Sequence, residues 1–244
     1  MVRPSAGTAI IVLLTVGLFA EKKPVTVTAG DGFPLKATLH STGKSGPGVL
    51  LLHQCNADRQ TYDNLGAMLN AAGYHVLALD FRGFGESKNA QYKDVASSRE
   101  KMPGDVDAAL AFLSSQPLVN KSLLGVIGAS CGVNQAIQAA RRHPEIRTLV
   151  LLSGGTDAEG EAFLKSSTKM PVFGAASEED TTAAASIRTI VHASTNGDSQ
   201  LTMFKEAGHA ASMFAKQPDL EADIVIWFRR NLPVAGYATL PSAR

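Results

Sequence analysis

The chain has 244 residues, of which 45% are hydrophobic and 18% charged, and its formal net charge is +1 at pH 7. This length suits one large α/β domain or two small ones. A nearly neutral chain without a run of lysine or arginine has no electrostatic basis for binding nucleic acid or an anionic membrane. We therefore expect a small or uncharged molecule as its partner.

The first twenty residues have the layout of a secretory signal peptide. Arg3 is followed by an uncharged stretch from Thr8 to Ala20, and charged residues come next. At ~1.5 Å per helical residue this stretch reaches only about 20 Å, less than a ~30 Å bilayer core. We expect an exported protein, periplasmic or extracellular, with no stable membrane span. Because Leu18 is large for a position before a cleavage site, an uncleaved N-terminal anchor over residues 1–20 is the alternative.

Beyond the leader, strand and helix patterns alternate along the chain. Residues 25–43 predict a hairpin around the turn Gly30-Asp31-Gly32. Further strands are predicted at 47–54, 74–80, 122–130, 146–155, 170–180 and 199–209, and helices at 61–73, 102–116, 132–143, 157–167, 181–194 and 218–232.

Most of these strands are continuous apolar runs, which is typical of strands covered on both faces. The order predicts one α/β domain over residues 22–233, with a mostly parallel eight-stranded sheet, helices on both faces and an antiparallel edge. Residues 234–244 are expected to form a loose tail.

The segment Gly128-Ala129-Ser130-Cys131-Gly132 lies between a predicted strand and a predicted helix. It fits G-x-S-x-G, a sharp turn whose flanking positions must be small. Centred on Ser130, the flanks are glycines, whereas centred on Cys131 they would be Ala129 and the β-branched Val133. The spacing predicts Ser130 as a nucleophile. The alternative is a tight strand–helix turn with an idle serine.

With this motif the chain resembles the α/β-hydrolase family, and in particular its small members without a lid, of the dienelactone-hydrolase-like kind. Three further matches carry the resemblance: VLLLHQCN, where Gln54 replaces a glycine; ALDFRGFGES, which fits D-x-R-G-x-G-x-S; and the strands MPVFGAASEED and KEAGHAASM. The resemblance covers residues 25–232 and implies the α/β-hydrolase fold. Only one short helix fits between residues 154 and 171, so no large lid is expected.

The family's chain order of serine, acid and histidine implies Ser130, Asp180 and His209 as the catalytic residues. Glu178 and Glu179 are adjacent to the acid and remain alternatives to it. His53 is expected to brace the loop that follows its strand through backbone contacts. Two cysteines are too few for a four-ligand zinc site, and we expect neither a cofactor nor a metal ion.

The resemblance also implies an oxyanion hole made by the backbone N–H groups of Cys131 and Cys55. Two N–H groups directed at one oxygen have nitrogens at most ~6 Å apart, which is compatible with the ~4.4–6.8 Å that a disulfide needs between its Cα atoms. A Cys55–Cys131 disulfide is therefore one hypothesis. Two small buried thiols that fill space under the loop are the interpretation that we favour from sequence.

These observations predict an exported serine hydrolase that cleaves carboxylic esters or related acyl bonds of a small-molecule substrate. A peptidase and a lactone hydrolase of the dienelactone type are alternatives within the enzymes. A binding or sensing protein that retains the fold is the alternative from another class. Gln54 bears on that choice, because its side chain is expected to reach the substrate site and could spoil it.

Overall fold

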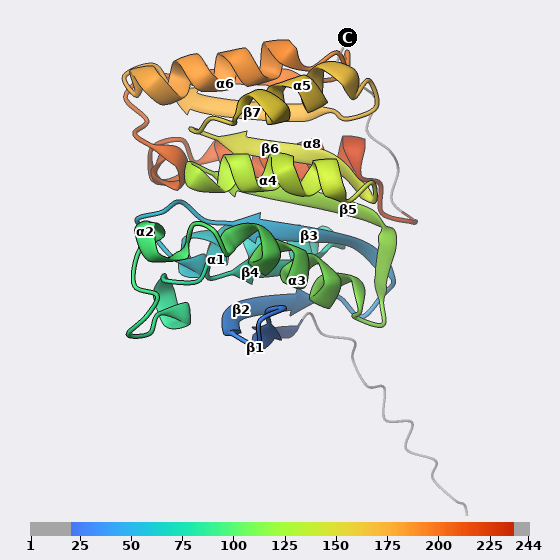
Figure 1. Ribbon diagram of the computed structural model, residues 1–244. Helices are drawn as coiled ribbons and strands as arrows, with labels where there is room; N and C mark the ends of the chain where they lie inside the picture. Colours follow the sequence, from blue (N-terminus) through green and yellow to red (C-terminus); the bar gives the residue numbers. More distant parts are fainter. Residues whose placement is uncertain (1–20, 237–244) are drawn as a thin grey trace, which may run out of the picture.

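An eight-stranded sheet runs through residues 21–236, the part of the chain that the computed structural model describes (Figure 1). The predicted leader (1–20) and the end of the predicted tail (237–244) lie outside that part, so export and anchoring stay predictions. The strands are β1 (Glu21–Thr28), β2 (Pro34–Ser41), β3 (Gly46–Leu52), β4 (His75–Leu79), β5 (Val119–Ala129), β6 (Ile146–Leu152), β7 (Val172–Ser177) and β8 (Gln200–Phe204).

The order across the sheet is β1-β2-β4-β3-β5-β6-β7-β8. The pairs β1–β2 and β2–β4 are antiparallel, and the pairs from β4–β3 through β7–β8 are parallel. The mostly parallel sheet with an antiparallel edge is thus confirmed. The hairpin turns at Gly32, whose φ of 83° favours glycine and whose N–H donates to the Ala29 carbonyl at 2.8 Å.

Helices cover both faces of the sheet. Their bounds are α1 (Asp63–Ala71), α2 (Val95–Ser98), α3 (Met102–Ser114), α4 (Cys131–Arg142), α5 (Ala158–Ser166), α6 (Thr181–Ala193), α7 (Met213–Lys216) and α8 (Asp219–Asn231), with short 3-10 turns η1 (Arg59–Tyr62), η2 (Gly85–Ser87) and η3 (Ala210–Ser212). One apolar cluster packs α3, α4, α5 and α6 against one face, and a second packs α1 and α8 against the other. Figure 1 shows α3, α4 and α6 in front of the sheet and α8 behind it. None of the helices in residues 21–236 is long and apolar enough to span a bilayer.

The parallel strands end at one edge of the sheet, where the predicted functional segments lie (Figure 1). Between β6 and β7 the chain forms only α5, so the expectation of no large lid holds there. No helix or strand was predicted between residues 80 and 102, yet the loop after β4 contains η2 and α2. Helix α2 forms because the Asp94 carboxylate accepts the Ser97 N–H at 2.9 Å, and the Ser97 hydroxyl accepts the Asp94 N–H in return.

Candidate active site

Ser130 lies at the sharp turn between β5 and α4. Its φ of 52° is a conformation that residues with a side chain rarely adopt, and its N–H donates to the Leu152 carbonyl at 2.8 Å. A Cβ at Gly128 would lie 2.3 Å from the Gly132 carbonyl oxygen, and one at Gly132 would lie 2.6 Å from the Leu52 carbonyl oxygen. Both flanking positions therefore require glycine. This explains why the two glycines identify Ser130 as the central residue of the motif.

Asp180 and His209 meet at the same edge of the sheet. Asp180 precedes α6 and His209 follows β8, and the Nδ1 of His209 lies 2.5 Å from the Asp180 Oδ2. The two side chains are 24% and 41% exposed. When the carboxylate accepts a hydrogen bond from Nδ1–H, the unprotonated Nε2 is the basic nitrogen of the ring. It is directed away from the acid.

The two neighbouring acids have other partners. Glu178 forms an ion pair with Arg188 at 2.5 Å. Glu179 accepts the Ser177 hydroxyl at 2.6 Å and the Glu206 N–H at 2.7 Å, and the Ser177 hydrogen bond in particular lowers the pKa of Glu179. Of the three acids at this strand end, Asp180 is therefore the one in contact with His209.

Ser130 and His209, both in the described part of the chain, share no hydrogen bond. Their segments nevertheless meet, because Ser153 follows β6 beside the Ser130 turn and its hydroxyl lies 3.9 Å from the Met213 sulfur, just after the His209 segment. Catalytic hydrogen bonds are often long before substrate binds. In the structure, Asp180 is hydrogen-bonded to His209. Ser130 lies at the same end of the parallel strands but is not hydrogen-bonded to His209.

His53 braces the loop that follows β3, as expected. Its Nε2 accepts the Phe81 N–H at 3.0 Å, and its Nδ1 donates to the Gln54 carbonyl at 2.7 Å. Burial lowers the pKa of His53, so the ring is neutral and carries its proton on Nδ1. This arrangement ties the loop after β3 to the end of β4.

Cys55 and Cys131 form a disulfide, with 5.8 Å between their Cα atoms. The interpretation favoured from sequence, two buried thiols, is therefore wrong. The sequence pattern places both cysteines within three residues of a strand end, Cys55 after β3 and Cys131 after β5, but it does not give the directions of the side chains. Because the Cys131 sulfur is bonded to Cys55, it is not available as a nucleophile.

The backbone N–H groups of the same two residues are unengaged. Cys131 is the first residue of α4, where a helix has no internal partner for its N–H. Among residues 21–236, the Cys55 N–H donates to no other group. Within residues 21–236, both N–H groups thus lie next to the Ser130 turn without a hydrogen-bond partner.

Both the oxygen and the nitrogen of the Gln54 side-chain amide form hydrogen bonds within the protein. Its Oε1 accepts the Ala211 N–H at 2.9 Å, and its Nε2 donates to the Asn56 Oδ1 at 2.6 Å. Sequence reasoning singled out Gln54 but missed this link, since nothing local signals a contact across 157 positions. Contact between Gln54 and substrate stays a prediction.

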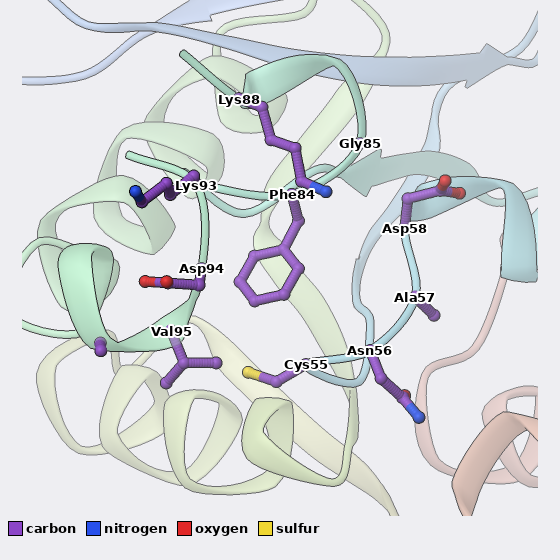
Figure 2. A pocket seen from close by; sticks show the side chains of 11 residues that line it. Cys55, Asn56, Ala57, Asp58, Phe84, Gly85, Lys88, Lys93, Asp94 and Val95 are labelled. Atoms are coloured by element: carbon purple, nitrogen blue, oxygen red, sulfur yellow. The ribbon is translucent and has the colours of Figure 1, made fainter. Parts of the chain in front are cut away.

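A pocket of about 780 Å³ opens beside the disulfide. Figure 2 shows the Phe84 ring above the Cys55 sulfur, with Val95 on one side and Asn56 on the other. Lys88 and other residues of the loop after β4 line the pocket together with Ala57 and Asp58 of the loop after β3.

The signature from Asp80 to Ser87 fixes the loop that forms this pocket. Asp80 is fully buried and accepts the N–H groups of Arg59 at 2.8 Å and Glu86 at 2.9 Å. Gly85 has a φ of 48°, and a Cβ there would lie 2.3 Å from the Asp80 carboxylate. This motif therefore has a structural role in the loop after β4.

Comparisons with known proteins agree with this architecture. A family model described as serine aminopeptidase, S33, matches residues 44–173. Uncharacterized protein Rv2307c of Mycobacterium tuberculosis is 30% identical over 124 residues, which are 50% of this chain and 42% of that protein. Thiohydrolase aneE of Aspergillus aculeatus is 29% identical over 133 residues, 54% of this chain and 40% of that protein. The matches thus span less than half the length of these relatives.

Two solved structures are similar over most of the chain. Esterase Pf2001 of Pyrococcus furiosus superposes with a TM-score of 0.71 at 20% identity, covering 87% of this chain and 93% of that one. A dienelactone hydrolase of Anabaena variabilis gives 0.70 at 19% identity, covering 87% of this chain and 99% of that one. At these identities the likeness establishes the fold.

Proposed function

Because the chain belongs to the serine aminopeptidase, S33, family of α/β hydrolases and is a hydrolase of that type, we propose that it cleaves carboxylic esters. The reaction proceeds through a Ser130–His209–Asp180 triad and an acyl-enzyme. The observation that carries the proposal is the His209–Asp180 pair, 2.5 Å apart, at the strand edge where Ser130 lies on a strained turn. The neighbours whose names say esterase and dienelactone hydrolase support the same class.

The chemistry follows from the position of the proton on His209. With Nδ1–H donating to Asp180, Nε2 takes the proton of the Ser130 hydroxyl as the oxygen attacks the ester carbonyl. Asp180 stabilises the imidazolium, which then protonates the leaving alcohol. In the second half of the cycle His209 activates a water molecule, and the acid is released from Ser130.

The negative oxygen of each tetrahedral intermediate needs hydrogen-bond donors that are already in place. The unengaged N–H groups of Cys131 and Cys55 are our candidates for this oxyanion hole. Removing one such donor typically costs about 3 kcal/mol in the barrier. Neither donor requires a cofactor or a metal ion.

The ester substrate is favoured by the absence of a large lid between β6 and β7. An open edge suits an accessible small ester better than a long lipid enclosed by the protein. The thiohydrolase relative makes thioesters the related acyl class to compare, and the family's description makes peptides another.

A fluorophosphonate probe tests the nucleophile directly, because it reacts with an activated serine. We expect labelling of the unaltered protein, none of Ser130→Ala, and normal labelling of the control Ser153→Ala, which alters a serine at the neighbouring strand end. Loss of labelling in the control alone would contradict the assignment of Ser130.

A substrate panel then tests the ester assignment. It consists of p-nitrophenyl esters of increasing chain length, an acyl thioester, a lactone and an aminoacyl p-nitroanilide. We expect the highest kcat/KM for a short ester. A higher kcat/KM for the anilide than for every ester would replace the esterase with a peptidase.

We further propose that the protein works outside the cytoplasm. The disulfide supports this, because such bonds persist in oxidising compartments. Fractionation of producing cells checks it: the protein is expected in the periplasmic or extracellular fraction with both cysteines protected from alkylation. Recovery in the cytosol with two free thiols would contradict it.

A further inference from the structure

The disulfide connects two segments that flank the nucleophile. Cys131 directly follows Ser130, and Cys55 lies in the loop after β3, 76 positions away along the chain. These are the two residues whose N–H groups we assign to the oxyanion hole. The covalent bond therefore joins the two donors to each other and joins both to the Ser130 turn.

The Cys55 backbone has little else to hold it. Within residues 21–236 no hydrogen bond involves its N–H or its carbonyl, whereas the residues on both sides are tied down. The His53 ring accepts a hydrogen bond from the Phe81 N–H, and the Ala57 N–H donates to the Gln54 carbonyl at 3.1 Å. The position of the Cys55 N–H thus depends on the disulfide more than on hydrogen bonds.

From these contacts we infer that the Cys55–Cys131 disulfide is a positioning element for the oxyanion hole, and that its reduction lowers the turnover of the enzyme. The inference rests on the proposed function and adds a regulation of that site. A catalytic donor must stay about 3 Å from the developing oxyanion to be effective. Without the bond, the Cys55 N–H no longer has a fixed distance from the Cys131 N–H.

A dithiol reductant can reach the bond. Both cysteines are only partly buried, and Cys55 lines the pocket in Figure 2. One thiolate of the reductant attacks the Cys55 sulfur, which releases the Cys131 thiolate and forms a mixed disulfide. The second thiol of the reductant displaces Cys55, so the protein gains two electrons and two protons while the dithiol becomes a cyclic disulfide.

Steady-state kinetics before and after dithiothreitol test the inference. We expect kcat on the best p-nitrophenyl ester to fall at least tenfold while KM changes less than threefold, and reoxidation to restore kcat. The pH profile should keep its shape, because the reduction leaves His209 and Asp180 in place. The double variant Cys55→Ala/Cys131→Ala should have the low kcat of the reduced protein and should not respond to dithiothreitol.

Circular dichroism and Trp227 fluorescence, recorded on the same samples, separate positioning from unfolding. A fall in kcat that follows the loss of native signal would mean that the disulfide only stabilises the fold, which overturns the inference. An unchanged kcat with two alkylated thiols also overturns it. Absence of fluorophosphonate labelling in both redox states would instead overturn the proposed function, and equal labelling rates in both would overturn only the positioning role.

A second observation concerns the other side of the same loop. Gln54 carries its amide to the Ala211 N–H, two residues beyond His209. Gln54 is 8% exposed, and the segment that its side chain reaches begins with Ala210 at a φ of 53°, a conformation unusual for alanine. A buried N–H in such a segment needs its acceptor, because a buried donor that makes no hydrogen bond destabilises the folded chain.

We propose that Gln54 is a positioning residue for His209. Its amide sets the distance between the loop that carries Cys55 and the segment that carries the histidine. Gln54 stands where the motif that VLLLHQCN resembles has a glycine. A glycine at this position would have no side chain to make the link to Ala211. Asn56, which accepts from the Gln54 Nε2, fixes the orientation of the amide.

Gln54→Gly and Gln54→Glu make a matched pair of tests. Gln54→Gly removes the link, and we expect kcat to fall at least tenfold with KM within threefold. Gln54→Glu keeps an oxygen for the Ala211 N–H, and the Asn56 amide can turn its Nδ2 toward the second oxygen, so kcat should stay within threefold. Gln60→Gly, at an exposed position in η1, controls for the effect of glycine itself.

Two outcomes would overturn this proposal. A normal kcat in Gln54→Gly would show that His209 does not depend on the link. A rise in KM in both Gln54 variants, at unchanged kcat, would show that the amide contacts the substrate instead.

Discussion

Two acid–base pairs of this protein have similar geometry and very different surroundings. Arg82 and Asp105 lie 2.6 Å apart with side chains 2% and 1% exposed, whereas His209 and Asp180 lie 2.5 Å apart with side chains 41% and 24% exposed. A pair enclosed by protein cannot meet a substrate, so its charges act only on other groups of the protein. A pair at the strand edge keeps one ring nitrogen for chemistry. Burial therefore separates a structural pair from the pair that we propose to be reactive.

The enclosed pair belongs to a larger network of contacts around Arg82. Arg82 also binds Asp31 in the hairpin turn at 2.7 Å, and the rings of Phe33 and Tyr92 lie 4.4 and 4.8 Å from its guanidinium carbon. These contacts join the hairpin, α3 and the loop after β4 into one unit. Since that loop forms a wall of the pocket beside Cys55, the buried network helps to shape that pocket.

The largest expected effect comes from breaking the open pair. Asp180→Asn keeps the size of the side chain but no longer fixes the proton on Nδ1 of His209, and we expect kcat to fall on the order of 10⁴-fold, as for such changes in other triads. Because the pair is partly exposed, the free energy of unfolding should change by less than about 1 kcal/mol. Ester hydrolysis and urea unfolding measure the two quantities.

Glu178→Gln is the control for that variant. Glu178 lies two residues away and pairs with Arg188, so its loss should change kcat less than about tenfold. A large loss of kcat in Glu178→Gln, together with a normal kcat in Asp180→Asn, would show that the acid is Glu178 and not Asp180.

Breaking the enclosed pair should have the opposite effect, a large loss of stability with little change in kcat. In Asp105→Asn the buried Arg82 loses one of its two charged partners and keeps Asp31, so we expect a loss of stability near the lower end of the about 3–5 kcal/mol that is typical when a buried pair is broken. The folded fraction should keep a kcat within about threefold of the unaltered protein. Urea unfolding followed by Trp227 fluorescence, with kinetics below the transition, checks both values.

Asp107→Asn is the matched control on the same helix, α3. Asp107 pairs with Arg142 at 2.7 Å with both side chains more than a third exposed, so this variant should lose at most about 1 kcal/mol. Equal destabilisation by the two substitutions would mean that burial does not distinguish them.

Periodicity and motif spacing were sufficient to predict the sheet, its antiparallel edge and the strand ends that carry Ser130, Asp180 and His209. Those features depend on local residue order, since continuous apolar runs and the flanking glycines act on their own segments. The choice among Glu178, Glu179 and Asp180 was open, because adjacent residues in a loop point in directions that only the folded chain defines.

The disulfide and the Gln54–Ala211 link could not be decided from sequence for the same reason. Each joins loops far apart in the chain, and each depends on where a side chain points after the strands have set the distance between the loops. The short helix α2 was missed for a different reason. Its capping residues, Asp94 and Ser97, are in the sequence, but four residues of helix are too few to show an apolar period.

A smaller effect is expected when buried groups that lack a charged partner are titrated. Burial lowers the pKa of His40, His53 and His75 in the folded protein, while the unfolded chain keeps values near 6.5. Above about pH 7 all three are neutral in both states, so they contribute no pH dependence. As the pH falls through 6.5 the unfolded state binds protons first, and the free energy of unfolding decreases until the pH drops below the folded pKa values.

His75→Gln tests this contribution away from the site, because His75 begins β4 at the opposite end of the strand. Between pH 7 and pH 5 the variant should lose less stability than the unaltered protein. The comparison is of slopes against pH, measured by urea unfolding, so a constant destabilisation of the variant does not affect it. An identical slope in both proteins would mean that His75 takes up its proton equally well in the folded state.

The smallest effect is expected where a pair is most open. Arg141 and Glu159 lie 2.7 Å apart on α4 and α5, with side chains 32% and 73% exposed. Water already solvates both charges, so Glu159→Gln should cost about 0.2–1 kcal/mol in low salt, and 1 M sodium chloride should remove most of that difference by screening. The cost of Asp105→Asn should persist in the same salt, because counterions do not reach a pair that the protein encloses. If salt cancelled both costs alike, the Arg82 network would be open to solvent, and the contrast between the enclosed and the open pair would no longer hold.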